Sequence, residues 1–198
     1  MVLLDVAADA YLCLPGVGEA WRTSVMADGE VTCEALCGGL AEAGLLRPMT
    51  DAAPRIVPQK PTHTALGAGG PALSWRHRRA LAAALWDVAW RYRGRSLAQM
   101  LEHVAQNRRG RQLSRDEACV VRLSRAFEHA VVWAPLPAKC LVRSFFLLNF
   151  LHRCGFDATW CFGVSTWPFS AHCWLQVGAV ALDEFAEHLD GYATIHAV

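Results

Sequence analysis

The stretch KCLVRSFFLLNFLHRCGFDATWCFGV, residues 139–164, decides the fold of the second half of the chain. Its first part is apolar over several helical turns and ends at Gly155, a residue type that commonly follows a helix. Beyond Gly155 the pattern changes to that of strands, which we expect at 158–165, 171–177 and 179–184. The sequence therefore predicts a helix followed by an antiparallel sheet.

Three more helices are predicted before this one. Residues 75–93 and 97–109 have helical spacing of apolar side chains. Ser114 stands three residues before Glu117, which matches a capping box and predicts a third helix that runs to about Trp133. Four helices followed by strands, without alternation of the two, indicate an α+β fold.

The first 46 residues have a different character. Seven acidic residues stand against Arg22 alone. Apolar residues at 2–4 and 11–14 are spaced for a hairpin, and 17–26 and the segment after Thr32 are spaced for two short helices. Two strands and two helices predict a small winged-helix-like module.

A proline- and glycine-rich segment follows this module. Residues 47–74 contain five prolines, which stiffen the chain, and three glycines, which disfavour a helix. We therefore expect three parts, with boundaries at 1–46 for the small module, 47–74 for a linker and 75–198 for the second domain.

Composition excludes several classes of protein. Apolar residues make up 54% of the 198 and charged residues 19%, enough to bury a core. The net charge of +1 gives no general attraction to nucleic acid or to membranes. The N-terminus lacks the pattern of a secretory signal, so the eight cysteines are expected to be reduced in the cytoplasm.

Cys140 is the best candidate for a nucleophile. It follows a proline-rich turn and opens an apolar helix, whose N-terminal dipole, together with Lys139, favours a thiolate. His172 lies on a later strand, as a base in a Cys-His arrangement would. The alternative, a buried structural cysteine, is common for this residue type.

Two acids compete to orient His172. If Gly178 and Ala179 form a two-residue turn, strand alternation places Asp183 on the face of His172. A three-residue loop with a bulge would place Glu184 there instead. The residues alone leave both acids open.

Other residues have plainer interpretations. Cys33 and Cys37 are one helical turn apart, but no second pair at zinc-like spacing follows, so packing is favoured and no metal is expected. Trp167, beside His172 in a proline-containing loop, is a candidate wall of a cleft. Three cysteines are expected in the core: Cys154, Cys161 and Cys173.

Arginines gather at the start of the second domain, between residues 76 and 111, with few acids among them. The plainer interpretation is a set of solvated helix faces and helix C-termini. The alternative is a basic patch that meets the acidic first module or an acidic partner.

The sequence resembles a known family at three places: residues 139–164, SAHCWLQVG at 170–178 and LDEFAEHLDGYATIHAV at 182–198. These resemble the lasso-peptide maturation protease, the B protein, which is a transglutaminase-like, papain-related cysteine peptidase. The segment LLDVAADAYLCLPGVGEAW, residues 3–21, is similar to that family's winged-helix-like precursor-recognition element.

This resemblance implies a function and assigns roles. The family's nucleophile falls on Cys140 and its base on His172, while its acid falls on Glu184 by ungapped spacing or on Asp183 by residue type. The leader of a ribosomal precursor peptide would add as a strand beside Tyr11 and Leu12. An ATP-dependent cyclase would take the freed core, and the chain itself, which has no P-loop, would need no cofactor.

Two other functions stay open at this point. One is another acyl-transfer enzyme with the same architecture, such as a transglutaminase or an arylamine acetyltransferase. The other is a leader-binding chaperone whose triad no longer works. The nature of the precursor and the oligomeric state do not follow from the sequence.

Overall fold

The computed structural model describes residues 2–6, 8–14, 34–42, 58–67, 69–91, 95–132 and 139–198. The chain separates into two compact units, one of Met1–Asp5 and Ala10–Arg55 and the other of Val6–Asp9 and Ile56–Val198. The second unit contains the elements β3 (His63–Thr64), α3 (Trp75–Arg91), α4 (Leu97–Arg108), α5 (Glu117–Val131), α6 (Cys140–Arg153), β4 (Thr159–Thr166), β5 (Phe169–Val177), β6 (Val180–Ala181), the 3-10 helix η1 (Ala186–Gly191) and β7 (Ala193–Ala197).

The first unit contains a hairpin and a helix. Strand β1 (Val2–Asp5) pairs antiparallel with β2 (Ala10–Cys13), so the predicted hairpin is confirmed. Helix α2 (Glu34–Glu42) confirms the helix predicted after Thr32. The helix expected at 17–26 lies outside the described residues, and the winged-helix arrangement therefore stays a prediction.

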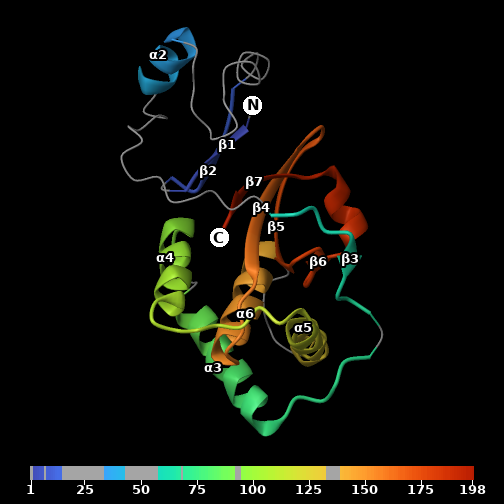
Figure 1. The fold of residues 1–198 in the computed structure, drawn as a ribbon. Coiled ribbons are helices and arrows are strands. Elements are labelled where there is room, and N and C mark those ends of the chain that lie inside the picture. Colours follow the sequence, from blue (N-terminus) through green and yellow to red (C-terminus); the bar gives the residue numbers. More distant parts are fainter. Residues whose placement is uncertain are drawn as a thin grey trace. The chain divides into compact units, whose positions relative to one another are not determined.

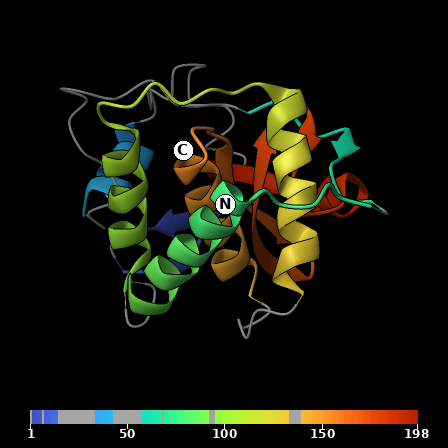
Figure 2. The same cartoon turned by 90° about the horizontal axis from the view of Figure 1, so that it is seen from below.

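Helix α6 forms the centre of the second unit. It contacts α3, α4, α5 and β5, and in Figure 2 α3 and α4 lie on one side of it and α5 on the other. All residues from Ser144 to His152 are buried, as expected for a helix enclosed on every side. Gly155, at φ +87°, ends α6, and the N–H groups of Gly155 and Phe156 donate to the carbonyls of His152 and Leu151. This is the glycine-terminated end that the sequence predicted.

The start of α5 differs from the prediction. The N-cap is Asp116, whose carboxylate accepts the Cys119 N–H at 2.7 Å, and Ser114 lies outside the helix. Ser114 is held instead by backbone pairing with the segment after α6, because its N–H donates to Gly155 and its carbonyl accepts from Asp157. Because α5 begins at Glu117, Ser114 lies two residues before the N-cap.

The sheet is mixed rather than purely antiparallel (Figure 1). Its order is β3-β6-β5-β4-β7, and β3 runs parallel to β6 while the other pairs are antiparallel. Strands β4 and β5 match the predicted 158–165 and 171–177 closely. Strand β6 ends at Ala181, earlier than predicted, and neither β3 nor β7 was predicted.

Part of the predicted linker belongs to this sheet. The backbone of Ala65 donates to Ala181, and Arg125 on α5 donates to the Ala65 carbonyl at 2.8 Å. Gln176 on β5 donates to the Gln59 carbonyl at 2.7 Å. The main-chain groups of residues 59–65 therefore contribute hydrogen bonds at this edge of the sheet. The proposed domain boundaries stay predictions.

Within the part of the chain that the structure describes, no helix has both the length and the apolar character needed to cross a membrane.

Candidate active site

Cys140 occupies the first turn of α6, where a buried network holds the backbone. The Ser144 hydroxyl donates to the Cys140 carbonyl at 2.9 Å and accepts the indole N–H of Trp160 at 2.8 Å. Ser144 and Trp160 are both fully buried. The network therefore ties the turn that carries the sulfur to strand β4 and limits its movement.

The environment of Cys140 favours a thiolate. The thiol of Cys173, the imidazole of His172 and the backbone N–H of Cys173 form hydrogen bonds to the Cys140 sulfur, and together they lower the pKa of Cys140 to about 4. Partial burial opposes them but is outweighed. Cys173 stays protonated, because its bond to the Cys140 sulfur and its burial raise the pKa of Cys173 far above the usual value. This is the environment that a nucleophilic cysteine requires.

His172 lies on β5 beside Cys140. Its ring lies next to two aromatic rings, that of Trp174 at a centroid distance of 6.3 Å and an interplanar angle of 18°, and that of Tyr192 at 5.5 Å. Gly163 pairs opposite His172 on β4, and a Cβ at Gly163 would come within 2.8 Å of the Trp174 ring. The absence of a side chain at Gly163 therefore lets Trp174 lie flat beside the imidazole. The bond to Cys140 and the carboxylates nearby raise the pKa of His172 despite its partial burial.

Glu184 is the acid that contacts His172. Its Oε2 lies 3.1 Å from His172 Nε2, and its Oε1 accepts the Phe185 N–H at 2.8 Å and lies 3.2 Å from His188 Nδ1. Burial opposes ionisation of Glu184, but these hydrogen bonds and the two histidines hold the pKa of Glu184 below its usual range. With Nε2 facing Glu184, the other ring nitrogen of His172 is left for the Cys140 sulfur.

Asp183 has a different position. It is buried, and its Oδ1 accepts the backbone N–H of Leu175 at 2.8 Å. Burial raises the pKa of Asp183 to about 7, against the opposing effect of the Leu175 hydrogen bond. Asp183 therefore completes the main-chain hydrogen bonding of β5 and does not contact the His172 ring.

The turn that precedes these acids is the two-residue form. Val177 pairs with Val180 and Gln176 with Ala181, as the simpler alternative required. The two-residue turn nevertheless predicted that Asp183 would face His172, because that prediction assumed that the strand continues to residue 184. The carboxylate of Asp183 takes the N–H of Leu175 and ends the ladder, so the chain bends at 182–184 and strand alternation no longer applies.

The predicted peptide-binding residues are exposed. Trp167 is 94% exposed in the β4–β5 turn, so it stands clear of the core and does not pack against His172. Tyr11 and Leu12 lie on β2 of the first unit, also exposed. Their binding role stays a prediction.

Two other cysteines that were expected in the core have raised pKa values. Cys161 is buried and Cys154 half-buried, and burial raises the pKa of Cys154 to about 11 and that of Cys161 to about 12. Cys33 lies outside the described residues. Among the residues that are described, no group of three or more His, Cys, Asp or Glu side chains is placed to hold a metal.

Sequence reasoning missed the part that Cys173 plays at the site. It was expected only in the core, and it is indeed buried. Adjacent strand residues alternate between faces, so His172 and Cys173 would not be expected to contact one sulfur. The signal that could have found Cys173 is its place directly after the candidate base, because its main-chain N–H is then carried to the same point.

Comparison with known proteins agrees with this geometry. A family model described as the transglutaminase-like superfamily matches residues 82–197, more than half of the chain. The chain belongs to this superfamily. The match spans Cys140, His172 and Glu184, and it supports a papain-like domain of the cysteine peptidase or acyl-transferase type. No curated protein and no solved structure matched the chain.

Proposed function

We propose that this transglutaminase-like chain is a cysteine peptidase that cleaves the leader from a lasso precursor peptide before the core is cyclised. The contact that carries the proposal is His172 Nε2 to Glu184 Oε2 at 3.1 Å, next to a thiol whose pKa is lowered to about 4. A nucleophile, a base and an acid in mutual contact are what acyl transfer by a cysteine requires. The lasso substrate rests on the sequence resemblance of residues 139–198 and 3–21.

The first half of the reaction would form an acyl-enzyme. The Cys140 thiolate attacks the carbonyl carbon at the junction of leader and core, and the carbonyl oxygen takes the negative charge. When the tetrahedral intermediate collapses, the C–N bond breaks and the His172 imidazolium gives its proton to the leaving amine. The leader then remains as a thioester on Cys140, and the core leaves with a free α-amine.

The second half would restore the enzyme. Neutral His172 takes a proton from a water molecule, whose oxygen attacks the thioester carbonyl. The C–S bond breaks, the leader leaves as a carboxylic acid, and Cys140 and His172 return to the ion pair. Glu184 stays ionised throughout and keeps the imidazole in one orientation, because the pKa of Glu184 is held below its usual range.

The oxyanion would be stabilised by the start of α6. Lys139 at the N-cap makes no side-chain capping bond, and the first intrahelical bond on this turn is from the Arg143 N–H to the Lys139 carbonyl. The Cys140 N–H precedes that bond and has no carbonyl one turn back within the helix. A main-chain N–H of this kind suits an oxyanion that develops next to the sulfur.

Leader recognition would fall to the first unit. The exposed side chains of Tyr11 and Leu12 lie on strand β2, whose partner is β1 alone among the described strands. An extended leader could add to such a sheet by main-chain hydrogen bonds. The product amine would pass to an ATP-dependent cyclase, which supplies the energy for macrolactam formation.

Mass spectrometry of a reaction with a candidate lasso precursor tests this proposal. We expect two fragments from wild-type protein, with masses that add up to the precursor plus one water, and none from Cys140→Ala. Cys154→Ala is the matched control and should cleave normally. A precursor or amine that gains mass without hydrolysis would indicate a transferase, and binding without any change in mass would indicate a chaperone.

A further inference from the structure

A polar cleft lies among helices α3, α4 and α6, away from Cys140. Its volume is about 460 Å³. The part of α6 that lines the cleft is its C-terminal end, where His152 lies twelve residues after Cys140. At 1.5 Å per residue this places the two about 18 Å apart along the axis, so the cleft is not part of the candidate active site.

The walls of this cleft carry an excess of positive charge. Four guanidinium groups line it, and a single carboxylate, Asp87, faces them. Asp87 is already bound by Arg153. Among the described residues, no carboxylate forms an ion pair with the three other lining arginines, which are Arg76, Arg79 and Arg111.

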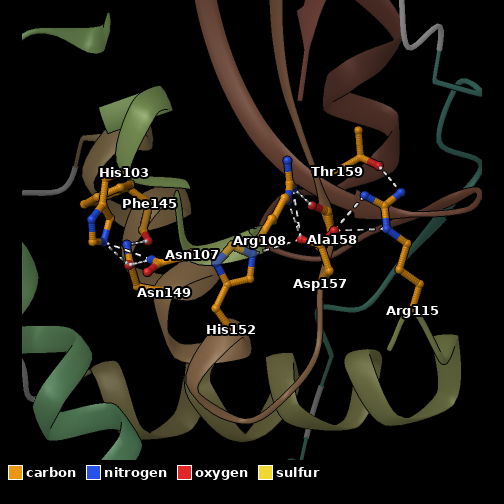
Figure 3. Close-up of polar contacts among 10 residues, drawn as sticks. All are labelled: His103, Asn107, Arg108, Arg115, Phe145, Asn149, His152, Asp157, Ala158 and Thr159. Carbon is orange, nitrogen blue, oxygen red and sulfur yellow. Dashed lines mark hydrogen bonds and ion pairs between the residues drawn. The ribbon is translucent and has the colours of Figure 1, made fainter. Parts of the chain in front are cut away.

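His152 supplies an unsatisfied polar atom in the same lining. Its side chain is 1% exposed, and its Nε2 lies 2.9 Å from Asp157 Oδ1. Figure 3 shows that the Asp157 carboxylate also accepts hydrogen bonds from the guanidinium groups of Arg108 and Arg115. Although burial alone would raise it, these bonds hold the pKa of Asp157 well below its usual range. Asp157 is therefore an acceptor only, and Nε2 carries the hydrogen.

Among the described residues, nothing bonds to the other nitrogen of His152, Nδ1, although that atom is buried. A buried polar atom without a partner is costly and rare in native proteins. The bond to Asp157 fixes the orientation of the ring, so Nδ1 cannot turn to find a partner elsewhere. A bound ligand would satisfy it.

We propose that this cleft binds an oxyanion, the phosphate or carboxylate group of a ligand. The guanidiniums of Arg76 and Arg111 would hold two of its oxygens from the rim, since their N–H groups match phosphate and carboxylate geometry. His152 Nδ1, the acceptor left by the bond of Nε2 to Asp157, would take a hydrogen from an O–H of the ligand or of a water molecule held with it. The site does not depend on the proposed peptidase activity.

Isothermal titration of the full-length protein tests this site. Inorganic phosphate and glutarate serve as the two probes, with sodium chloride used to keep the ionic strength equal. We expect saturable one-to-one binding of at least one probe. Tighter binding of phosphate would identify a phosphate ligand, and tighter binding of glutarate would identify a carboxylate. If neither probe binds beyond the chloride control, the proposal is wrong.

Variants locate the binding. Arg76→Gln combined with Arg111→Gln should weaken the better probe by about tenfold or more, because two charge-assisted contacts are lost. Arg78→Gln is the matched control, on the same helix but outside the lining, and should bind as wild type. Equal binding by the double variant and by wild type would overturn the proposal.

A third variant addresses His152 itself. In His152→Gln the side-chain amide can still donate to Asp157 in place of Nε2, but Nδ1 is gone. We expect weaker binding of the same probe with little change in melting temperature when no probe is present. Unchanged affinity in a folded His152→Gln protein would contradict the role of Nδ1. If this variant does not fold, the exposed Arg76 and Arg111 still decide the question.

Discussion

The Nε2 atom of His172 lies 3.1 Å from Oε2 of Glu184, across the bend that follows strand β6. The neighbouring Asp183 is buried and accepts the N–H of Leu175. One acid thus contacts the candidate base, and the other accepts a main-chain hydrogen bond from the strand that carries it. This division of roles makes the two adjacent carboxylates separable by mutation.

Replacing Glu184 should impair catalysis without unfolding the protein. Glu184→Ala removes the group that stabilises the imidazolium and fixes its orientation, so we expect kcat to fall by ~10²–10⁴-fold, by analogy with serine triads. Glu184 is half-buried and its pair with His172 lies near solvent, so the melting temperature should change little. Single-turnover cleavage of the precursor gives the rate.

Asp183→Asn is the matched control. The pKa of Asp183 is raised to about 7, and the asparagine carbonyl can accept the Leu175 N–H as the carboxylate does. We therefore expect the single-turnover rate to stay within about threefold of wild type, since the acceptor is preserved. A loss in Asp183→Asn as large as that in Glu184→Ala would show that the contact with His172 does not identify the orienting acid.

Cys173 should influence the pH dependence of alkylation at Cys140. Its thiol donates to the Cys140 sulfur, and a donor favours the charged form and lowers the pKa. Cys173→Ala removes that donor, so the pKa of Cys140 should rise. As the pH is lowered, the reaction of Cys140 with iodoacetamide should then begin to slow at a higher pH than in wild type. Peptide mapping of the alkylated protein measures this at each pH.

Cys161→Ala serves as the control for this substitution. Cys161 is also buried in the sheet, but its sulfur donates to Gln176 at 3.4 Å rather than to Cys140. Its loss should leave the pH profile of Cys140 unchanged. If the profiles of both variants coincide with that of wild type, the Cys173 thiol contributes nothing to the acidity of Cys140.

Asp157 should be important for stability. It is buried and binds Arg108, Arg115 and His152, so Asp157→Asn leaves cationic groups without their partner. We expect the free energy of unfolding at pH 7 to fall by ~3 kcal/mol, in the range for broken buried pairs. Because the pKa of Asp157 is lowered on folding, its contribution is complete above the unfolded value of about 3.9 and declines as pH falls below it.

Urea denaturation across pH measures both effects. The difference between wild type and Asp157→Asn should be largest above about pH 5 and should narrow below about pH 4. Asp190→Asn is the control, since its pair with Lys60 is exposed and worth at most ~1 kcal/mol. A difference that does not depend on pH would mean that the charge of Asp157 is not what stabilises the fold.

Truncation should reveal where the second unit begins. A chain that starts at Ile56 keeps Gln59 and Ala65, whose carbonyls are bound by Gln176 and Arg125. A chain that starts at Trp75 loses both and leaves β6 as an open edge. We expect the first to unfold cooperatively and the second to melt at lower temperature or to aggregate. Equal melting temperatures would show that residues 59–65 add nothing to stability.

The helices and the position of Cys140 at a helix start could be predicted because local signals carry them. Periodicity and the closing Gly155 define α6, and a cysteine at the first turn of that helix has a dipole beside it whatever the rest of the fold does. The strands β4 and β5 likewise show in their apolar, β-branched and aromatic residues. Each of these features depends on residues that lie close together in the sequence.

Features that depend on distant residues could not be predicted. Strand β3 is two residues long and exists because β6 offers it an edge. Ser114 matched a capping box, but its main chain pairs with residues 155–157, so the cap moved to Asp116. The alternation of strand residues between faces did not predict the position of Asp183, because the Asp183 carboxylate, rather than a main-chain carbonyl, accepts the last N–H of the strand pairing, that of Leu175. In each case tertiary contacts overrode a sound local pattern.

The pH dependence of Cys140 alkylation tests the central claim most directly, because it needs no substrate. With a pKa lowered to about 4, Cys140 should react with iodoacetamide at a nearly constant rate from neutral pH down to about pH 5. In His172→Ala the loss of a hydrogen-bond partner and its charge should move the midpoint upward. A wild-type midpoint near ~8.5, the value of an ordinary thiol, unchanged in His172→Ala, would contradict the account.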